Sequence, residues 1–106
     1  MEALTSAQRK YLRGLANPLD ALILVGKQGV TDNLVRAVDS DLEAHELIKV
    51  RFNEFKDEKD ALSEVIRSRT NSQIVGRIGH VVMFYREHPD PEKRSITLPT
   101  QRPKRA

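Results

Sequence analysis

The stretch from Leu22 to Thr31, LILVGKQGVT, decides the fold expected of this chain. Its first four residues form a short apolar run, which is typical of a buried strand. Thr31 can cap a helix, and the apolar residues after it recur at helical spacing. A Gly-x-x-Gly loop lies between the two, and it holds Lys27 and Gln28. The sequence therefore predicts a strand, a tight turn and a helix in direct succession.

The two glycines of this loop, Gly26 and Gly29, suit a site that a ligand approaches closely. Glycine lets the backbone turn sharply and removes the β-carbon that would keep a partner away. Because the loop leads into a helix N-terminus, its N–H groups point to a place where an anion can sit. In KH domains a loop of this kind clamps the backbone of a few nucleotides. The alternative is a plain turn, since many strand-to-helix connections need two glycines.

The composition indicates one soluble domain. The chain has 106 residues, of which 39% are hydrophobic and 31% charged. No apolar run approaches the length of a membrane span, and the N-terminus lacks the features of a signal peptide. The absence of cysteine excludes disulfides and thiolate metal sites and agrees with a cytoplasmic location. We expect a domain over residues 1–99 and a disordered basic tail over residues 100–106.

Charge is distributed unevenly along the chain. The formal net charge is +3. Residues 93–106 contain five cations and no acid, so residues 1–92 carry a slight negative excess. Any surface for nucleic acid must therefore be local, a patch together with the tail.

Enzymatic and metal-binding functions are not indicated. His45, His80 and His88 are scattered without the spacing of metal ligands. No serine, histidine and acid can be placed together as a catalytic set. We expect no cofactor, no metal and no small-molecule substrate.

The first helix is predicted to begin at a capping box made by Thr5 and Gln8 and to end at Asn17-Pro18. Its apolar residues at helical spacing are Tyr11, Leu12, Leu15 and Ala16, and its cations are Arg9, Lys10 and Arg13. These cations are candidates for contact with phosphate. A solvated basic face is the alternative interpretation.

Two further helices follow the loop, with a strand between them. The second helix is predicted from Asp32 to His45, with an inner stripe of Leu34, Val35, Val38 and Leu42. The strand from Leu47 to Phe52 alternates, placing Ile48, Val50 and Phe52 inward and Lys49 and Arg51 outward. The third helix, from about Lys56 to Arg69, is predicted to bury Ala61, Leu62, Val65 and Ile66.

The remaining apolar runs predict a hairpin. Ile74-Val75 and Val81–Tyr85 are expected as strands around a turn from Gly76 to Gly79, a second Gly-x-x-Gly without a phosphate role. Residues 95–99 could add a short edge strand. The order α-β-α-β-α-β-β predicts an α/β fold, a two-layer sandwich with a mixed four-stranded sheet.

Several of these stretches together resemble the CRM family (chloroplast RNA splicing and ribosome maturation), in its stand-alone bacterial YhbY form. The matching stretches are QRKYLR at 8–13, LVGKQGVT at 24–31, HELIKV at 45–50, VGRIG at 75–79, FYR at 84–86 and KRSITLP at 93–99. Two departures are Val30, where the family often has leucine, and Asp20-Ala21, where it commonly has proline.

The resemblance implies a fold like the C-terminal domain of bacterial translation initiation factor 3. It also implies a monomer that binds ribosomal RNA in precursors of the large ribosomal subunit and assists their assembly. The candidate RNA-binding residues are Gly26, Lys27, Gln28, Gly29, Thr31, Arg9, Lys10, Arg13, Lys49 and Arg51. The competing hypothesis is a ribosome-associated protein-binding module that docks a basic partner through the acids of the second helix, Asp39, Asp41 and Glu43.

Overall fold

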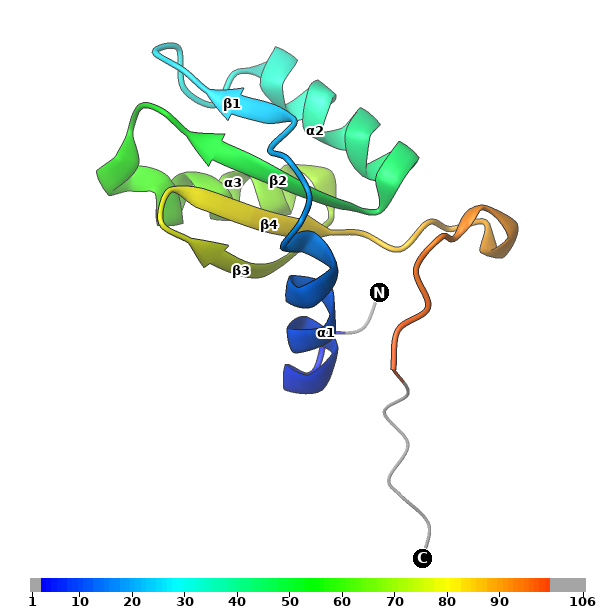
Figure 1. The fold of residues 1–106 in the computed structure, drawn as a ribbon. Helices are drawn as coiled ribbons and strands as arrows, with labels where there is room; N and C mark the ends of the chain where they lie inside the picture. The colour runs from blue at the N-terminus through cyan, green and yellow to red at the C-terminus, as the bar shows by residue number, and fades with distance from the viewer. Residues whose placement is uncertain (1–2, 100–106) are drawn as a thin grey trace, which may run out of the picture.

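A mixed four-stranded sheet with the order β1-β2-β4-β3 forms the centre of the protein (Figure 1). The strands are β1 (Ile23–Val25), β2 (Leu47–Phe52), β3 (Gln73–Ile78) and β4 (Val81–Tyr85). β1 pairs with β2 in parallel, and the other two pairings are antiparallel. This computed structural model describes residues 3–99, so the predicted tail of residues 100–106 lies outside the described residues.

Three helices and two short 3-10 turns connect the strands. The helices are α1 (Ser6–Ala16), α2 (Asp32–His45) and α3 (Lys59–Thr70), and the 3-10 turns are η1 (Lys56–Glu58) and η2 (Pro91–Lys93). The predicted capping box is present, since the hydroxyl of Thr5 accepts from the backbone N–H of Gln8 and the Gln8 side chain accepts from that of Thr5. Thr31 caps α2 as predicted.

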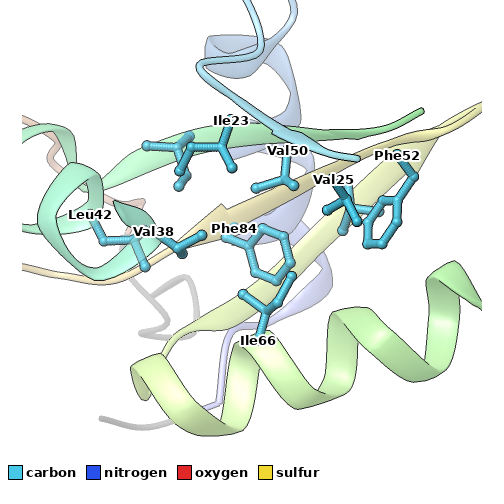
Figure 2. Close-up of a cluster of buried hydrophobic side chains, with 10 residues drawn as sticks. Ile23, Val25, Val38, Leu42, Val50, Phe52, Ile66 and Phe84 are labelled. Carbon is cyan, nitrogen blue, oxygen red and sulfur yellow. The ribbon is translucent and has the colours of Figure 1, made fainter. Parts of the chain in front are cut away.

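The main core lies between the sheet and the two helices α2 and α3 (Figure 2). The inward positions of β2 alternate as the sequence predicted, and the inner stripe of α2 packs on them. The buried members are Ile23, Val25, Val38, Leu42, Ile48, Val50, Phe52, Ile66, Val82 and Phe84. This layer of helices and the sheet form the predicted two-layer α/β sandwich.

Helix α1 covers part of the opposite face of the sheet. Its buried residues Leu12 and Ala16 pack with Leu47, Met83 and Tyr85, at the end of the sheet where β2 begins and β4 ends. The other end of this face has no helix over it (Figure 1). The α/β class and the mixed sheet are confirmed, and α1 adds a partial third layer. The likeness to initiation factor 3 stays a prediction.

Strand β1 is shorter and less buried than its apolar sequence predicted. Leu22 and Leu24 are 55% and 53% exposed, whereas Ile23 and Val25 are buried. β1 is an edge strand, and Leu24 lies on the face that α1 covers only in part. The prediction that all four residues are buried is therefore wrong for these two.

Helix α3 buries a narrower stripe than predicted. Val65 is 42% exposed and Ala61 is also exposed, so the prediction that both are buried is wrong. The stripe consists of Ile66 and the small polar residues Ser63 and Thr70, with Leu62 partly buried. Spacing of three and four residues places this set on one side of the helix, and only that side meets the sheet and α2.

The predicted hairpin is confirmed, but its turn is shorter. β3 continues to Ile78, so Gly76 lies inside the strand, beside an irregularity in its pairing with β4. A β-carbon on Gly76 would lie 2.6 Å from Cδ of Arg13. The predicted turn from Gly76 to Gly79 is therefore wrong in extent, because Gly76 serves the packing of α1 on β3.

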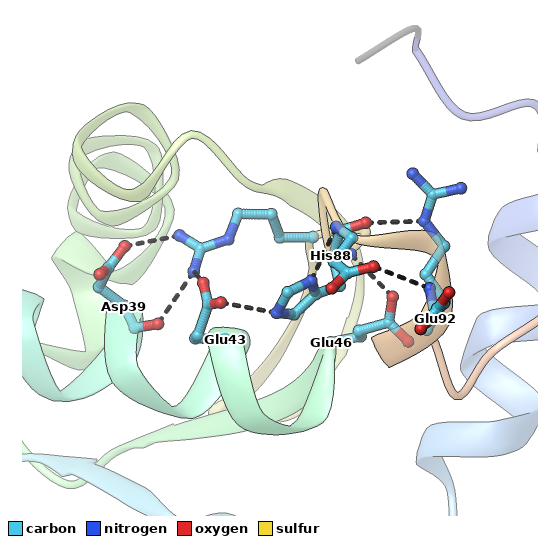
Figure 3. A network of polar contacts seen from close by, with 8 residues as sticks. Asp39, Glu43, Glu46, His88 and Glu92 are labelled. Atoms are coloured by element: carbon cyan, nitrogen blue, oxygen red, sulfur yellow. Dashed lines mark hydrogen bonds and ion pairs between the residues drawn. The ribbon is translucent and has the colours of Figure 1, made fainter.

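The segment after β4 runs along the body instead of forming the predicted edge strand over residues 95–99. The carboxylate of the buried Glu46 accepts a hydrogen bond from the backbone N–H of His88 at 2.8 Å (Figure 3). It also accepts from the backbone N–H groups of Ser95 and Ile96, at 2.8 and 3.1 Å. Ile96 and Leu98 then pack on the cluster under α1. Because the backbone N–H groups of Ser95 and Ile96 donate to the Glu46 side chain, this segment does not pair with a strand of the sheet.

Candidate nucleic-acid interface

The Gly26–Gly29 loop lies at the end of the sheet that α1 leaves open. It leaves β1 beside the C-terminal end of β2, since Val25 pairs with Phe52. The N–H of Gly29 donates to the carbonyl of Gly26 at 3.0 Å, which closes a tight turn. Lys27 and Gln28 form the exposed tip of this turn. The loop is a tight turn whose tip faces solvent.

The two glycines of the loop have different physical roles. Gly29 has a φ of 72°, in the left-handed region that favours glycine, and a β-carbon there would lie 3.4 Å from the ring of Phe55. Gly26 has no positive φ, and a β-carbon there would meet no atom within 4 Å. The free protein therefore needs glycine at 29. At position 26, glycine leaves space in which another molecule can approach the backbone closely.

Helix α2 begins directly after the loop. Thr31 Oγ1 accepts from the N–H of Leu34 at 3.1 Å, while the N–H groups of Asp32 and Asn33 have no intrahelical partner. Asp32 in that turn carries a negative charge, but its carboxylate pairs with Arg69 at 2.8 Å. The dipole at the helix start is thus available to an anion, with the acidic charge beside it largely offset.

A second loop supports the first one. The N–H groups of Asn53 and Glu54 both donate to the carbonyl of Val25, at 3.1 and 3.2 Å. This places Phe55 beside the Gly26–Gly29 loop, with Lys56 next to it in the chain, and sequence reasoning missed both residues. No local pattern could have found them, because they join the loop only through the parallel pairing of β1 with β2.

The predicted cations of α1 mostly serve the fold. Arg9 Nη1 donates to the carbonyl of Leu4 at 2.8 Å, and Arg13 Nη1 donates to that of Val75 at 3.2 Å. Lys49 on β2 is also engaged, since its Nζ donates to the carbonyls of Asn17 and Leu19 at 3.0 and 2.8 Å. Arg13 and Lys49 thus hold α1 and the segment after it against the sheet, whereas Arg9 ties the segment before α1 to the helix.

Cations without an internal partner gather at the loop end of the sheet. Within residues 3–99, the cationic side chains that make no hydrogen bond or ion pair are Lys10, Lys27, Arg51, Lys56 and Lys93. Lys27 is in the loop, Lys56 is in η1, and Arg51 pairs across the sheet with Leu24 just before the loop. We call the Gly26–Gly29 loop, the start of α2, Arg51 and residues 53–56 the loop end.

The predicted site residues therefore fall into two places. α1 lies over the opposite end of the sheet from the loop (Figure 1). A shallow groove of about 240 Å³ lies between them on the same face, and Asn17, Lys49, Arg51 and Ile78 contribute to its lining. Lys49 and Arg51 therefore lie on the surface between α1 and the Gly26–Gly29 loop.

Comparisons with known proteins identify the family of this chain. The model of the CRS1/YhbY (CRM) domain family matches residues 4–86. The chain belongs to the CRM domain family. The Bacillus subtilis protein YqeI, named a probable RNA-binding protein, is 36% identical over 97 residues, which cover 91% of this chain and 99% of YqeI. A Haemophilus influenzae protein named as RNA-binding is 31% identical over 100 residues, covering 93% of this chain and 98% of that protein.

A solved structure has the same fold as this CRM domain. The solution structure of a hypothetical Staphylococcus aureus protein, described as a candidate RNA-binding protein, superposes with a TM-score of 0.76 at 38% sequence identity. The match covers 92% of this chain and all of that one.

Two acids on the outer face of α2 in this CRM domain pair with side chains of the same chain (Figure 3). Asp39 Oδ1 lies 2.6 Å from Arg86 Nη1, and Glu43 Oε2 lies 2.6 Å from Nε2 of the buried His88. Arg86 also lies 3.5 Å from Glu43. Of the three acids proposed to dock a basic protein, two are thus engaged internally, which weakens that hypothesis.

Neither a metal site nor a membrane-spanning helix is found in the part of the chain that is described. Over residues 3–99, no three or more His, Asp or Glu side chains are grouped so that they could hold a metal ion. Over the same residues, no helix has the length and apolar character needed to cross a membrane.

Proposed function

We propose that the protein binds RNA through the loop end. The observation that carries this proposal is the gathering of three unpartnered cations, Lys27, Arg51 and Lys56, around a Gly-x-x-Gly loop at a helix N-terminus. Membership of the CRM family and the RNA-binding names of the relatives support it.

A phosphate group of the RNA backbone is the part of the ligand that the loop suits. The open space over Gly26 lets a phosphate come close to the backbone. Unpaired N–H groups at the start of α2 supply directional donors, and Lys27 adds a mobile point charge. Contacts of this kind fix position without reading sequence. The protein acts in this proposal as a binding module and not as an enzyme.

The family resemblance leads to a finer proposal about the partner. The RNA is ribosomal RNA in precursors of the large ribosomal subunit, met in the cytoplasm by a monomer that assists assembly. Lys10 on α1 and the groove with Lys49 and Arg51 extend the footprint away from the loop.

Four variants test the loop end against the rest of the surface. Binding to ribosomal RNA fragments is measured by filter retention over a range of salt concentrations. Lys27→Ala is compared with Lys10→Ala on α1 and with Lys93→Ala, which removes the same charge at a remote exposed site. Gly26→Asp places a negative charge in the loop, where a β-carbon has room.

We expect Lys27→Ala to weaken binding roughly tenfold, the range of one charged hydrogen bond, and to lower the salt slope by about one unit. Gly26→Asp should weaken it further, and Lys93→Ala should bind nearly as wild type does. Circular dichroism should be the same for all variants. Equal affinities of Lys27→Ala, Gly26→Asp and Lys93→Ala for RNA would show that the loop is only a turn.

A further inference from the structure

We propose that Phe55 stacks on an unpaired nucleobase of the RNA, next to the phosphate that the loop holds. The ligand is then single-stranded where it meets the loop end. This inference rests on the proposed function and adds a specific contact to it.

Phe55 is an aromatic side chain that the fold holds at the surface. Its side chain belongs to neither hydrophobic cluster, and the residue is 42% exposed. Its backbone has a φ of 56° and a ψ of 39°, the left-handed conformation that bulky residues rarely adopt. A positive φ on a residue of this kind stores strain, and strain of this sort is concentrated at functional sites.

The surrounding hydrogen bonds fix where the ring lies. On one side, Asn53 and Glu54 are bonded to the carbonyl of Val25, and on the other the N–H of Glu58 donates to the carbonyl of Phe55 at 3.0 Å. The backbone on both sides of the ring is therefore held. When a nucleobase stacks on such a ring, the protein loses little further conformational freedom, and this favours binding.

One face of the ring, around Cε2, lies against the Gly26–Gly29 loop. The β-carbon position of Gly29 lies 3.4 Å from Cε2 and 3.7 Å from Cζ of Phe55. The ring is thus close enough to the loop backbone for one nucleotide to contact both. A nucleotide whose phosphate lies over Gly26 can place its base on Phe55.

Charges around the ring favour one path for the RNA backbone. Lys27 is in the loop that the ring contacts and Lys56 follows the ring in η1, while Glu54, Asp57 and Glu58 make the η1 side acidic on balance. Acids repel phosphate but not the face of a neutral base. The backbone is therefore expected along Gly26 and Lys27, with the base directed toward Phe55. Stacking on aromatic rings accepts any base, so the contact selects for an unpaired nucleotide and not for a sequence.

The experiment uses the absence of tryptophan from the chain. Phe55→Trp introduces a single indole at the proposed stacking position. Val65→Trp introduces one on α3, outside the proposed footprint, at a position with equal exposure, 42%. On titration with an unstructured single-stranded RNA, we expect the indole at 55 to be strongly quenched and the indole at 65 to change little.

A second measurement separates stacking from mere support of the loop. Phe55→Leu keeps an apolar side chain against Gly29 but removes the ring face. We expect it to lose affinity for single-stranded RNA roughly tenfold while binding duplex RNA as wild type does. A single abasic nucleotide, moved along the RNA, should weaken wild type by a similar factor at one position and leave Phe55→Leu unaffected there.

Three results would count against the inference, and they have different meanings. An unquenched indole at 55 at saturating RNA, or an equal loss by Phe55→Leu on single-stranded, duplex and abasic RNA, would assign Phe55 to loop support only. Loss of binding in Lys27→Ala with normal binding in Phe55→Leu would refute stacking and leave the proposed function standing. A wild-type protein that retains no RNA would refute both.

Discussion

The substitution Glu46→Gln should destabilise the protein more than any change of a surface carboxylate. Glu46 is 1% exposed. Its Oε2 accepts from the N–H of His88, and its Oε1 accepts from the N–H groups of Ser95 and Ile96 and from the hydroxyl of Ser95. Every group that faces this carboxylate is a donor. Glutamine has the same shape but only one acceptor oxygen.

The size of the effect follows from these contacts. If the amide oxygen of glutamine replaces Oε1, the amide N–H₂ faces the N–H of His88, and one charge-assisted bond of about 1.5–3 kcal/mol is lost. The bonds that remain become neutral and weaken. The expected loss is about 2–4 kcal/mol, which lowers the melting temperature by roughly 10–20 °C in a domain of this size. Glu64→Gln, whose exposed carboxylate pairs with Arg67 on α3, should cost less than about 1 kcal/mol.

The same contacts predict a dependence on pH. Burial by itself raises the pKa of Glu46, but the hydrogen bonds from His88, Ser95 and Ile96 outweigh it and hold the pKa below its ordinary value of 4.5. A carboxyl with a lowered pKa stabilises the folded state above 4.5, and this stability is lost as the pH falls through the folded pKa. The difference between wild type and Glu46→Gln should therefore be greatest near neutral pH and shrink in acid.

Thermal melts of the wild type, Glu46→Gln and Glu64→Gln at several pH values measure both effects. The reasoning would be refuted if Glu46→Gln melted within a degree or two of Glu64→Gln. It would also be refuted if the difference from wild type stayed constant on acidification.

Three further outcomes are expected. Gly76→Ala should lower the free energy of unfolding by about 1 kcal/mol, because the new β-carbon displaces Arg13 from its hydrogen bond to the β3 backbone. Urea unfolding measures this cost, which should shrink in an Arg13→Ala background. Gly29→Ala should destabilise by about 1 kcal/mol through its positive φ while Gly26→Ala is nearly neutral, and equal midpoints in denaturant would contradict this. Deletion of residues 100–106 removes three cations and should weaken binding to all RNAs alike with a flatter salt slope, whereas a loss for one RNA alone would mean that the segment reads something specific.

Much of the candidate site could be predicted from the sequence, but not the roles of its members. The loop and its two glycines are found by local pattern, because a strand, two glycines and a helix cap follow each other directly. The cations of α1 are also visible in the sequence, yet Arg9 and Arg13 bind backbone carbonyls of the same chain. Whether a cation is free depends on what packs against it, and no pattern of charges reports that.

The sequence by itself determined the three helices and the approximate places of the four strands, since helix caps and apolar periodicity operate within about four residues. The capping box of Thr5 and Gln8, the cap at Thr31 and the alternation of β2 all operate over that range. The tertiary structure decided the rest through contacts between distant segments. The parallel pairing of Val25 with Phe52 brings Phe55 to Gly29, and the bonds of Glu46 to Ser95 and Ile96 keep the last segment out of the sheet. The order of the strands and the position of α1 then fix which apolar and basic side chains stay at the surface, because burial depends on which element covers each end of the sheet.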